Sequence, residues 1–129
     1  MVLYFETHIV EGVVSIGLGG NAIQKNEIVG WTHRTVAYDG DGQLLGFDYS
    51  CDGPAIVHVP RFSSGDVIGC GINLQSGNVI FACNGERIDT SDLKVNPEWN
   101  IPIVTLSGTN SEAQINFGPN FMMDMTNIL

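Results

Sequence analysis

Basic residues are scarce in this chain, and their scarcity limits the partners that it can bind. The 129 residues include 5 Lys and Arg against 14 Asp and Glu, which gives a formal net charge of −9. A surface of this charge repels phosphate backbones and anionic lipid headgroups. We therefore expect no nucleic-acid or membrane binding. A protein or peptide partner with a basic or neutral polar segment fits the charge better.

Long hydrophobic runs and cysteine pairs are also lacking. No apolar run approaches the roughly 18–20 residues that a membrane span requires. The N-terminal segment has no basic region and carries Glu6 early, so it does not fit a signal peptide. Cys51, Cys70 and Cys83 form an odd set without a C-x-x-C motif. This pattern favours reduced thiols in a cytoplasmic or nuclear protein, with a Cys70–Cys83 disulfide as the alternative.

Signatures of metal binding and catalysis are missing as well. The histidines show no zinc-ligand spacing, and no G-x-S-x-G nucleophile turn is present. The acidic turn at 39–42 resembles the start of a calcium loop, but Gln43 and Ser50 stand where further ligands are needed. Residues 17–22 fit G-x-G-x-x-A, yet the next segment lacks the helical stripe that a dinucleotide site requires. We therefore predict no enzymatic activity, no cofactor and no metal.

Short apolar runs separated by turn residues occupy most of the chain. Glycine accounts for 16 residues without a fixed period, which is typical of many turns. Eight or nine short strands at this spacing predict an all-β sandwich or barrel of antiparallel sheets. The expected strands are Leu3–Ile9, Val13–Leu18, Thr35–Tyr38, Leu44–Tyr49, Ala55–Val59, Val67–Leu74, Asn78–Cys83, Ile101–Leu106 and Ala113–Phe117.

The stretch from Gly65 to Gly85 predicts two hairpins in succession. In its first strand the even-numbered residues from Ile68 to Leu74 are all apolar, so they are expected to face the core. Gly69 and Gly71 lie on the other face, where another part of the chain can approach closely. The turns are expected at 75–77 and at Asn84-Gly85, because the second pair accepts positive φ.

Several motifs, in order, resemble those of the SPRY domain family, and within it the Ran-binding-protein-M type. The resemblance runs from residue 4 to about residue 121 and covers almost the whole chain. The order and spacing of the matching pieces together make it specific, and the longest piece is the run from Pro60 to Cys70, which matches P-x-F-x-x-G-D-V-I-G-C. The other matching pieces are Tyr4-Phe5-Glu6, Val14-Ser15-Ile16-Gly17, Gly30-Trp31, Tyr38-Asp39-Gly40-Asp41-Gly42, Phe81-Ala82-Cys83-Asn84-Gly85, Ile103-Val104-Thr105-Leu106 and Asn116-Phe117-Gly118.

The resemblance implies a bent β-sandwich of two antiparallel sheets without catalysis. It implies a protein interaction module that binds a short peptide or protein surface through loops at one end of the sandwich. In larger proteins such a module recruits a substrate or partner, for example to a ubiquitin ligase. The peptide-binding residues carried over by the resemblance are Tyr38, Asp39, Gly40, Asp41, Ser107, Gly108 and Thr109, with Tyr38 as the anchor.

The chain departs from the family pattern at several positions. Asp39 replaces the usual His, and Ser107-Gly108-Thr109 replaces a Val-Trp-Gly that would supply an apolar wall. The segment Gly46–Val59 is longer than usual and is expected either to add a hairpin or to cover the surface. The strands that often precede the Y-F-E motif are absent. We expect one domain over residues 1–121 and a C-terminal tail over 122–129, whose methionines pack on the sandwich or fray.

Of the aromatic and acidic residues singled out, Tyr38 and the aspartates have two interpretations each. Trp31 is expected to be a core tryptophan. Tyr38 is either a ligand contact or a packed tyrosine. Asp39, Asp41, Asp48 and Asp52 form either a solvated acidic loop set or a surface complementary to a basic ligand, which mainly affects association rate.

Two other classes of function remain open from the sequence. The sandwich could be a structural module that packs against another domain or subunit, which a large exposed apolar patch would favour. A carbohydrate-binding sandwich is the other alternative, because lectins share the architecture. The partner's identity and the oligomeric state are not determined by the sequence.

Overall fold

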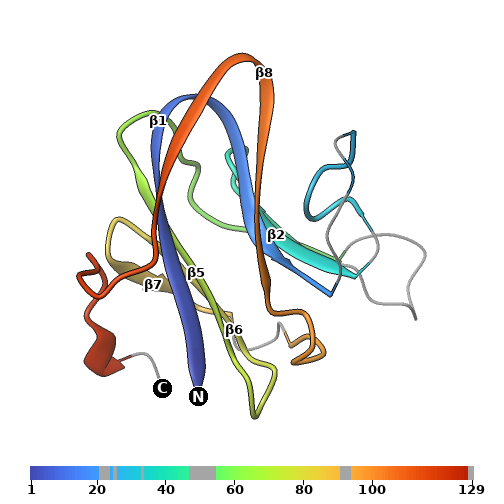
Figure 1. Ribbon diagram of the computed structural model, residues 1–129, viewed down its shortest axis with the longest axis vertical. Helices are drawn as coiled ribbons and strands as arrows, with labels where there is room; N and C mark the ends of the chain where they lie inside the picture. Colours follow the sequence, from blue (N-terminus) through green and yellow to red (C-terminus); the bar gives the residue numbers. More distant parts are fainter. Residues whose placement is uncertain (21–23, 25, 33, 47–54, 91–93, 128–129) are drawn as a thin grey trace.

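The first strand organises the fold because it belongs to both halves of the molecule. The computed structural model describes residues 1–129 except 21–23, 25, 33, 47–54, 91–93 and 128–129. β1 runs from Val2 to Gly19 and bends near Gly12, whose φ is +86°. β8, from Ile101 to Asn116, pairs antiparallel with β1 along both arms of the bend, with register shifts between Ile9 and Val13. The two strands together form the hinge of a bent sandwich (Figure 1).

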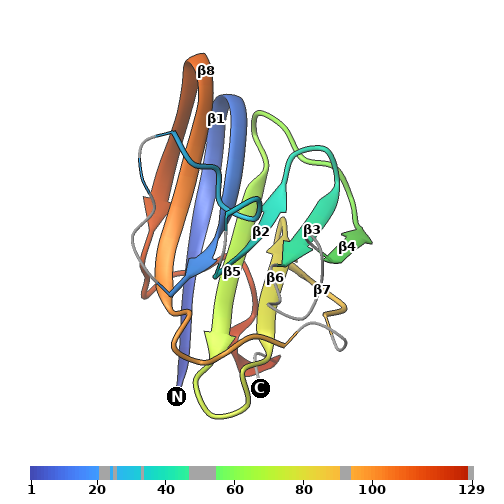
Figure 2. The same cartoon turned by 90° about the vertical axis from the view of Figure 1, so that its right-hand side faces the viewer.

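The remaining strands extend each arm into a sheet. One leaf of the sandwich has the order β8-β1-β5-β6-β7, and the other has the order β8-β1-β2-β3-β4. Figure 2 shows the second leaf from its outer side. The strand bounds are β2 Thr35–Asp39, β3 Gln43–Gly46, β4 Ala55–His58, β5 Val67–Asn73, β6 Val79–Cys83 and β7 Glu86–Ile88, and one 3-10 turn, η1, spans Met125–Asn127. All named pairings are antiparallel, which confirms the bent two-sheet sandwich.

The core lies between the leaves and is made of alternate residues of each strand. Ile68, Cys70 and Ile72 of β5 are completely buried in it, as the alternation predicted. They meet Phe81 of β6 and Tyr38 of β2, whose rings pack edge to face at a centroid distance of 5.9 Å. Burial of such side chains is the main favourable term in folding.

The outer face of β5 is covered by the start of the chain. A Cβ added to Gly69 would lie 1.9 Å from the Tyr4 hydroxyl, and one added to Gly71 would lie 2.3 Å from the Leu3 carbonyl oxygen. This close approach is the one that the two glycines predicted. Both expected hairpins also form, and Asn84 and Gly85 have φ of +53° and +85°.

The last residues fold back onto the same outer face. Met123 is buried against Ile80 and Ala82. This methionine therefore packs on the sandwich, which was one of the two alternatives expected for the tail. The Glu6 carboxylate, 3% exposed, accepts the backbone N–H groups of Met122 at 2.8 Å and Met123 at 3.1 Å. The domain boundary at residue 121 remains a prediction.

Some sequence-based expectations differ from the structure. The two expected strands at each end of the chain are single strands, β1 and β8, that continue through a bend. The short strand β7 completes the hairpin expected at Asn84-Gly85, although its bounds were not among the expected strands. β3 and β4 pair as an antiparallel hairpin, but residues 47–54 between them lie outside the described part, as do Asp48, Cys51 and Asp52. Cys70 and Cys83 are free thiols, so the disulfide alternative is wrong for this structure. Within the described residues, no helix is long and apolar enough to span a membrane.

Candidate functional site

The bend of the sandwich carries a hollow of about 390 Å³, here called the turn hollow. It is formed where five segments far apart in the sequence meet. These segments are the β1 bend, the segment before β2, the β2–β3 turn, the chain before β5, and the β8 bend. The lining residues are Gly12, Val13, Val14, Ser15, Ile28, Trp31, Asp39, Gly40, Asp41, Phe62, Ser63 and Ser107.

The two turns predicted to bind a peptide both reach this hollow. Asp39, Gly40 and Asp41 line it from the β2–β3 turn, and Ser107 lines it from β8. The remaining predicted residues, Gly108 and Thr109, are exposed beyond Ser107 but are not among the lining residues. The structure therefore brings together four of the predicted residues, and binding by any of them remains a prediction.

Tyr38 lies beneath the turn rather than on its surface. Its side chain is fully buried, its hydroxyl donates to the Pro60 carbonyl at 2.5 Å, and its ring packs edge to face with Phe62 at 4.9 Å. Burial raises the pKa of the Tyr38 hydroxyl well above its ordinary value. The expectation that Tyr38 anchors a peptide is therefore wrong. Its ring supports the turn from the core and cannot contact a ligand directly.

The acidic turn is held rigidly on this support. The Asp41 N–H donates to the Asp39 carboxylate at 3.1 Å, and the Gly42 N–H donates to the Asp39 carbonyl at 3.1 Å. Gly42 has a φ of +84°, which favours glycine, and its carbonyl accepts the Val59 N–H at 2.8 Å. Burial raises the pKa of the Asp39 carboxyl, while the Asp41 N–H opposes this rise. Asp41 itself is exposed to solvent at the rim.

Trp31 forms the wall of the turn hollow opposite the acidic turn, although the sequence predicted it to lie in the core. Trp31 is 50% exposed, so that expectation is wrong. Its neighbour Val29 is the buried member of this segment, packed against Ala37 and Ile103. The chain is pinned there because the Val29 N–H donates to the Thr105 hydroxyl at 3.2 Å and the Gly30 N–H donates to the Thr35 hydroxyl at 2.9 Å. This anchoring turns the indole outward.

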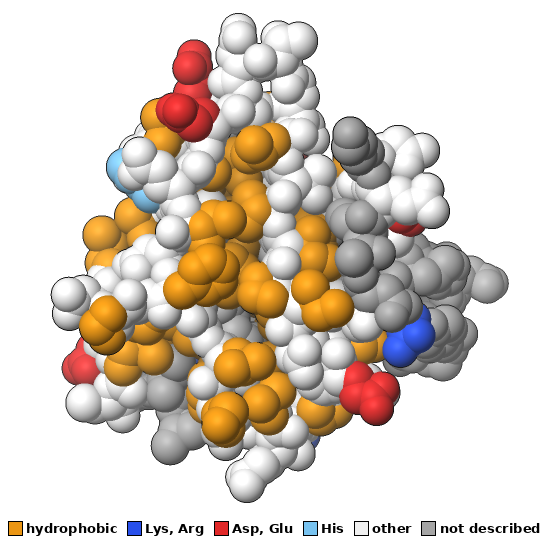
Figure 3. Space-filling view, viewed as in Figure 1, with side chains coloured by type: hydrophobic (Ala, Val, Ile, Leu, Met, Phe, Trp, Pro, Cys, Tyr) orange, Lys and Arg blue, Asp and Glu red, His pale blue; other side chains and the backbone are white. Residues whose placement is uncertain are grey.

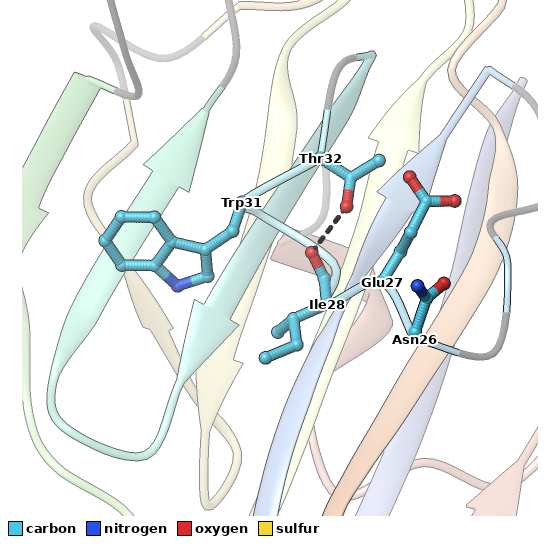
Figure 4. Close-up of a pocket in the computed structure, with 5 residues that line it drawn as sticks. All are labelled: Asn26, Glu27, Ile28, Trp31 and Thr32. Carbon is cyan, nitrogen blue, oxygen red and sulfur yellow. Dashed lines mark hydrogen bonds between the residues drawn. The ribbon is translucent and has the colours of Figure 1, made fainter.

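A second hollow, the loop hollow, lies next to the first and has a volume of about 440 Å³. It is lined by Asn26, Glu27, Ile28, Trp31 and Thr32, whose side chains are drawn in Figure 4. Trp31 and Ile28 line both hollows. The Thr32 hydroxyl donates to the Ile28 carbonyl at 2.9 Å and closes this small loop (Figure 4). The indole therefore stands between two concave surfaces.

The combined site is apolar and acidic. Val13, Ile28 and Trp31 are 61%, 40% and 50% exposed, which is much apolar area for neighbouring side chains. No Lys or Arg lines either hollow among the residues that the structure describes. In the same described set, no group of three or more His, Cys, Asp or Glu could hold a metal ion. The arrangement suits binding of a peptide segment with an apolar and a basic side chain.

The signal for Trp31 was present in the sequence but ambiguous. The Gly30-Trp31 pair follows an apolar residue and precedes polar ones, a pattern that fits either a buried or an exposed indole. A large aromatic next to a glycine with positive φ, here +93° at Gly30, indicates a tight loop rather than a strand. No sequence pattern indicated that Ile28 and Val13 would be exposed at this site.

Comparisons with known proteins agree with the fold described above. The family model of the SPRY domain matches residues 2–120. Ran-binding protein 9 of zebrafish (Danio rerio) and of human is each 30% identical over 96% of this chain. The chain spans only 21% and 17% of the length of these relatives.

Solved structures of the same architecture also match. A human SPRY domain superposes with a TM-score of 0.72 at 26% identity, over 92% of this chain and 78% of that one. The SPRY domain of human HERC1 superposes with a TM-score of 0.68 at 16% identity, over 93% of this chain and 77% of that one. At that identity the second match shows the fold alone.

Proposed function

Because the chain belongs to the SPRY domain family, a family of protein interaction modules, we propose that it captures a short peptide segment of a partner protein at the turn hollow. The observation that carries the proposal is the half-exposed Trp31 beside the rigid acidic turn. Exposed tryptophans on a rigid scaffold are frequent hot spots of protein interfaces. The residues that the structure describes at this site form a recognition surface without a catalytic constellation, and we propose a non-enzymatic role.

The charge of the site supports a preference for a basic segment. Asp39 and Asp41 lie on one wall of the turn hollow and Glu27 lies in the loop hollow. With a net charge of −9 and no described basic residue in either lining, the site attracts cations at long range. Such complementarity mainly increases the association rate and selects against acidic partners.

The setting of the module is a further part of the proposal. We place it in the cytoplasm or nucleus, since the two thiols that the structure describes, Cys70 and Cys83, are free and the net charge disfavours membrane surfaces. Within a longer protein or an assembly it would recruit the bound partner, for instance as the substrate-recruiting part of a ubiquitin ligase. A carbohydrate ligand has less support, because the exposed walls of the hollow are mainly apolar.

The proposal is tested by selecting a peptide and then removing the proposed contacts. A phage-displayed library of random peptides is screened on the folded chain, and the best binder is measured by fluorescence anisotropy. We expect Trp31→Ala to weaken binding by about 30-fold, which is the loss typical of a hot-spot residue. We expect Asp41→Asn to slow association and to reduce the salt dependence of the rate.

The matched control is Glu86→Gln, which removes one exposed carboxylate from β7, away from the lining of either hollow. It should leave the affinity within about twofold of wild type, since remote surface charges contribute little to a specific contact. Binding that survives Trp31→Ala and Asp41→Asn unchanged would show that the peptide binds elsewhere and would reject the proposed site.

A further inference from the structure

β8 forms the outer edge of both leaves. Its only strand pairing within the described residues is with β1, on one side, so its other side carries the unpaired backbone groups of an edge strand. Figure 2 shows β8 at the margin of the sandwich, and Figure 1 looks onto this margin. A long edge strand with free backbone groups is a template for pairing with another strand.

The inward face of this edge is apolar and open to solvent. Ala113 packs against the core, and the Phe117 ring lies 6.0 Å from that of core residue Phe5. Ile115 lies on the same face of the strand as Ala113 and Phe117, since it is opposite the buried Thr7 in the β1 pairing. Yet Ile115 is 47% and Phe117 is 68% exposed, and Leu106 on the other arm is 49% exposed. Figure 3 shows apolar side chains gathered between the two arms of β8.

The two arms of β8 differ in how well the edge is protected. Natural edges carry lysines, prolines or bulges that prevent further pairing. The arm that starts at Ile101 contains Pro102, which has no N–H to donate. The arm from Glu112 to Asn116 has neither lysine nor proline. This second arm is therefore the open one, and it is called the free arm below.

Charge indicates which partner the free arm fits. The molecule carries a net charge of −9, but Glu112 is the only charged residue between Trp99 and Met123. A basic partner finds its complement in the turn hollow and not here. Two copies of an acidic chain repel each other wherever acidic surfaces meet, so they approach most favourably along this strip, whose carboxylates are confined to one end, at Glu112 and its β1 neighbour Glu11.

We propose that the free arm pairs with the free arm of a second copy of this chain, antiparallel and centred on Gln114. A twofold axis through this position places Ala113 opposite Ile115 of the second copy, a small residue against a large one. It places Glu112 opposite Asn116 of the second copy, so no like charges face each other. The inward faces of both copies then lie on the same side of the joined sheet. The exposed apolar side chains of one copy, Ile115 and Phe117, continue into those of the other.

The proposed contact is small, and this sets the expected affinity. A pairing of one short arm falls at the low end of interface sizes, where association is weak and concentration-dependent. We therefore expect reversible dimers with a dissociation constant of roughly micromolar to tens of micromolar. This contact is independent of the turn hollow, so either proposal can fail while the other holds.

The test is sedimentation velocity of the 129-residue chain over a roughly hundredfold range of concentration. We expect the wild type to pass from monomer to dimer. Gln114 points outward beside His8 and lies at the centre of the proposed pairing. Gln114→Lys brings two ammonium groups together across the axis, and we expect it to abolish the dimer.

The matched control is Gln75→Lys, the same change at an exposed residue of the β5–β6 turn. It should dimerise like the wild type. Backbone hydrogen exchange of the wild type provides a readout that needs no variant: the amides of residues 112–116 should exchange more slowly as concentration rises. A chain that stays monomeric throughout overturns the proposal and leaves the edge to a strand of a different protein. A dimer that Gln114→Lys does not weaken overturns it as well.

Discussion

At the scale of single residues, two aromatic side chains differ from the roles that the sequence favoured for them. Tyr38, proposed as the peptide anchor with a packed tyrosine as the alternative, is buried, whereas Trp31 was expected in the core and is half exposed. β2 is buried on both faces, because the segment that holds Val29 covers its outer side. Alternation cannot distinguish the two faces of such a strand, so the tyrosine's direction was not predictable. The acidic turn itself was correctly located.

The buried Asp39 carboxyl of that turn leads to a prediction about how the stability of the folded chain depends on pH. Burial raises the pKa of Asp39 in the folded state, so the folded chain binds this proton more tightly than the unfolded chain does. Stability attributable to this group is therefore lost as pH rises from about 3.9, the ordinary pKa, through the raised value. Asp39→Asn keeps an oxygen that can accept the Asp41 N–H and removes the charge. We expect its urea midpoint to exceed that of wild type at pH 7.

The difference should shrink as the pH falls toward 3, where both proteins are uncharged at this position. Glu86→Gln, at an exposed site, serves as the control and should give no such pH-dependent difference. An Asp39→Asn variant that is less stable than wild type at pH 7 would contradict the assignment of a cost to burying this charge.

At the scale of elements, the sequence predicted where strands and turns lie better than how far each strand continues. The breaks expected after Ile9 and after Leu106 are bends within β1 and β8. The Ser111 hydroxyl joins these bends, since it accepts the Val13 N–H at 3.0 Å and donates to the Ser107 carbonyl. Glycine at a bend and glycine at a turn give the same local pattern. Only the pairing with a distant strand distinguishes them.

The β6–β7 turn provides a prediction at this scale. Asn84 has a φ of +53°, accepts the Val67 N–H at 2.9 Å and donates to the Asp66 carboxylate at 3.0 Å. Asn84→Ala removes both hydrogen bonds and disfavours the backbone conformation, so we expect a loss of about 2 kcal/mol in the free energy of unfolding. Asn84→Gly loses the bonds but keeps the conformation, and should cost about half as much.

The pKa of Asp66 is an independent readout of the same contact. The Asn84 amide, followed by the Ser63 N–H, holds the pKa of Asp66 below its ordinary value. Both variants should therefore raise it, as followed by NMR titration of the side-chain carboxyl. Equal stability losses for the two variants would show that the backbone conformation of residue 84 contributes nothing.

At the scale of the whole molecule, the sequence predicted the family and the bent sandwich but not the contacts that join its ends. Glu6 belongs to the Tyr4-Phe5-Glu6 motif, which was interpreted from the sequence only as part of a strand. In the structure it accepts a hydrogen bond from the Tyr4 hydroxyl at 2.9 Å as well as those from the last segment. Nothing local indicates a partner so distant in the chain. The same limit applies to the turn hollow, which combines five separate segments.

The role of Glu6 can be tested by its removal. Glu6→Ala leaves two backbone N–H groups without their acceptor, and we expect a loss of about 2–3 kcal/mol in the free energy of unfolding. Hydrogen exchange at Met122 and Met123 should become faster than in the rest of the sandwich. Glu11→Ala, at an exposed residue of the same strand, is the control and should change neither quantity. Unaltered exchange at both methionines would show that the segment is held by its apolar contacts alone.

The pairing of β1 with β8 also has a consequence for how the chain is made. Of the strands described here, β1 is synthesised first and pairs along most of its length with β8, which is synthesised last, and β2 to β7 are synthesised between them. Contacts so distant in sequence form slowly and late. Neither leaf can be completed before β8 has been synthesised, because both contain it. The edge of β1 that pairs with β8 therefore stays unpaired until β8 emerges, and in this interval the nascent chain is open to chaperones and to misassembly.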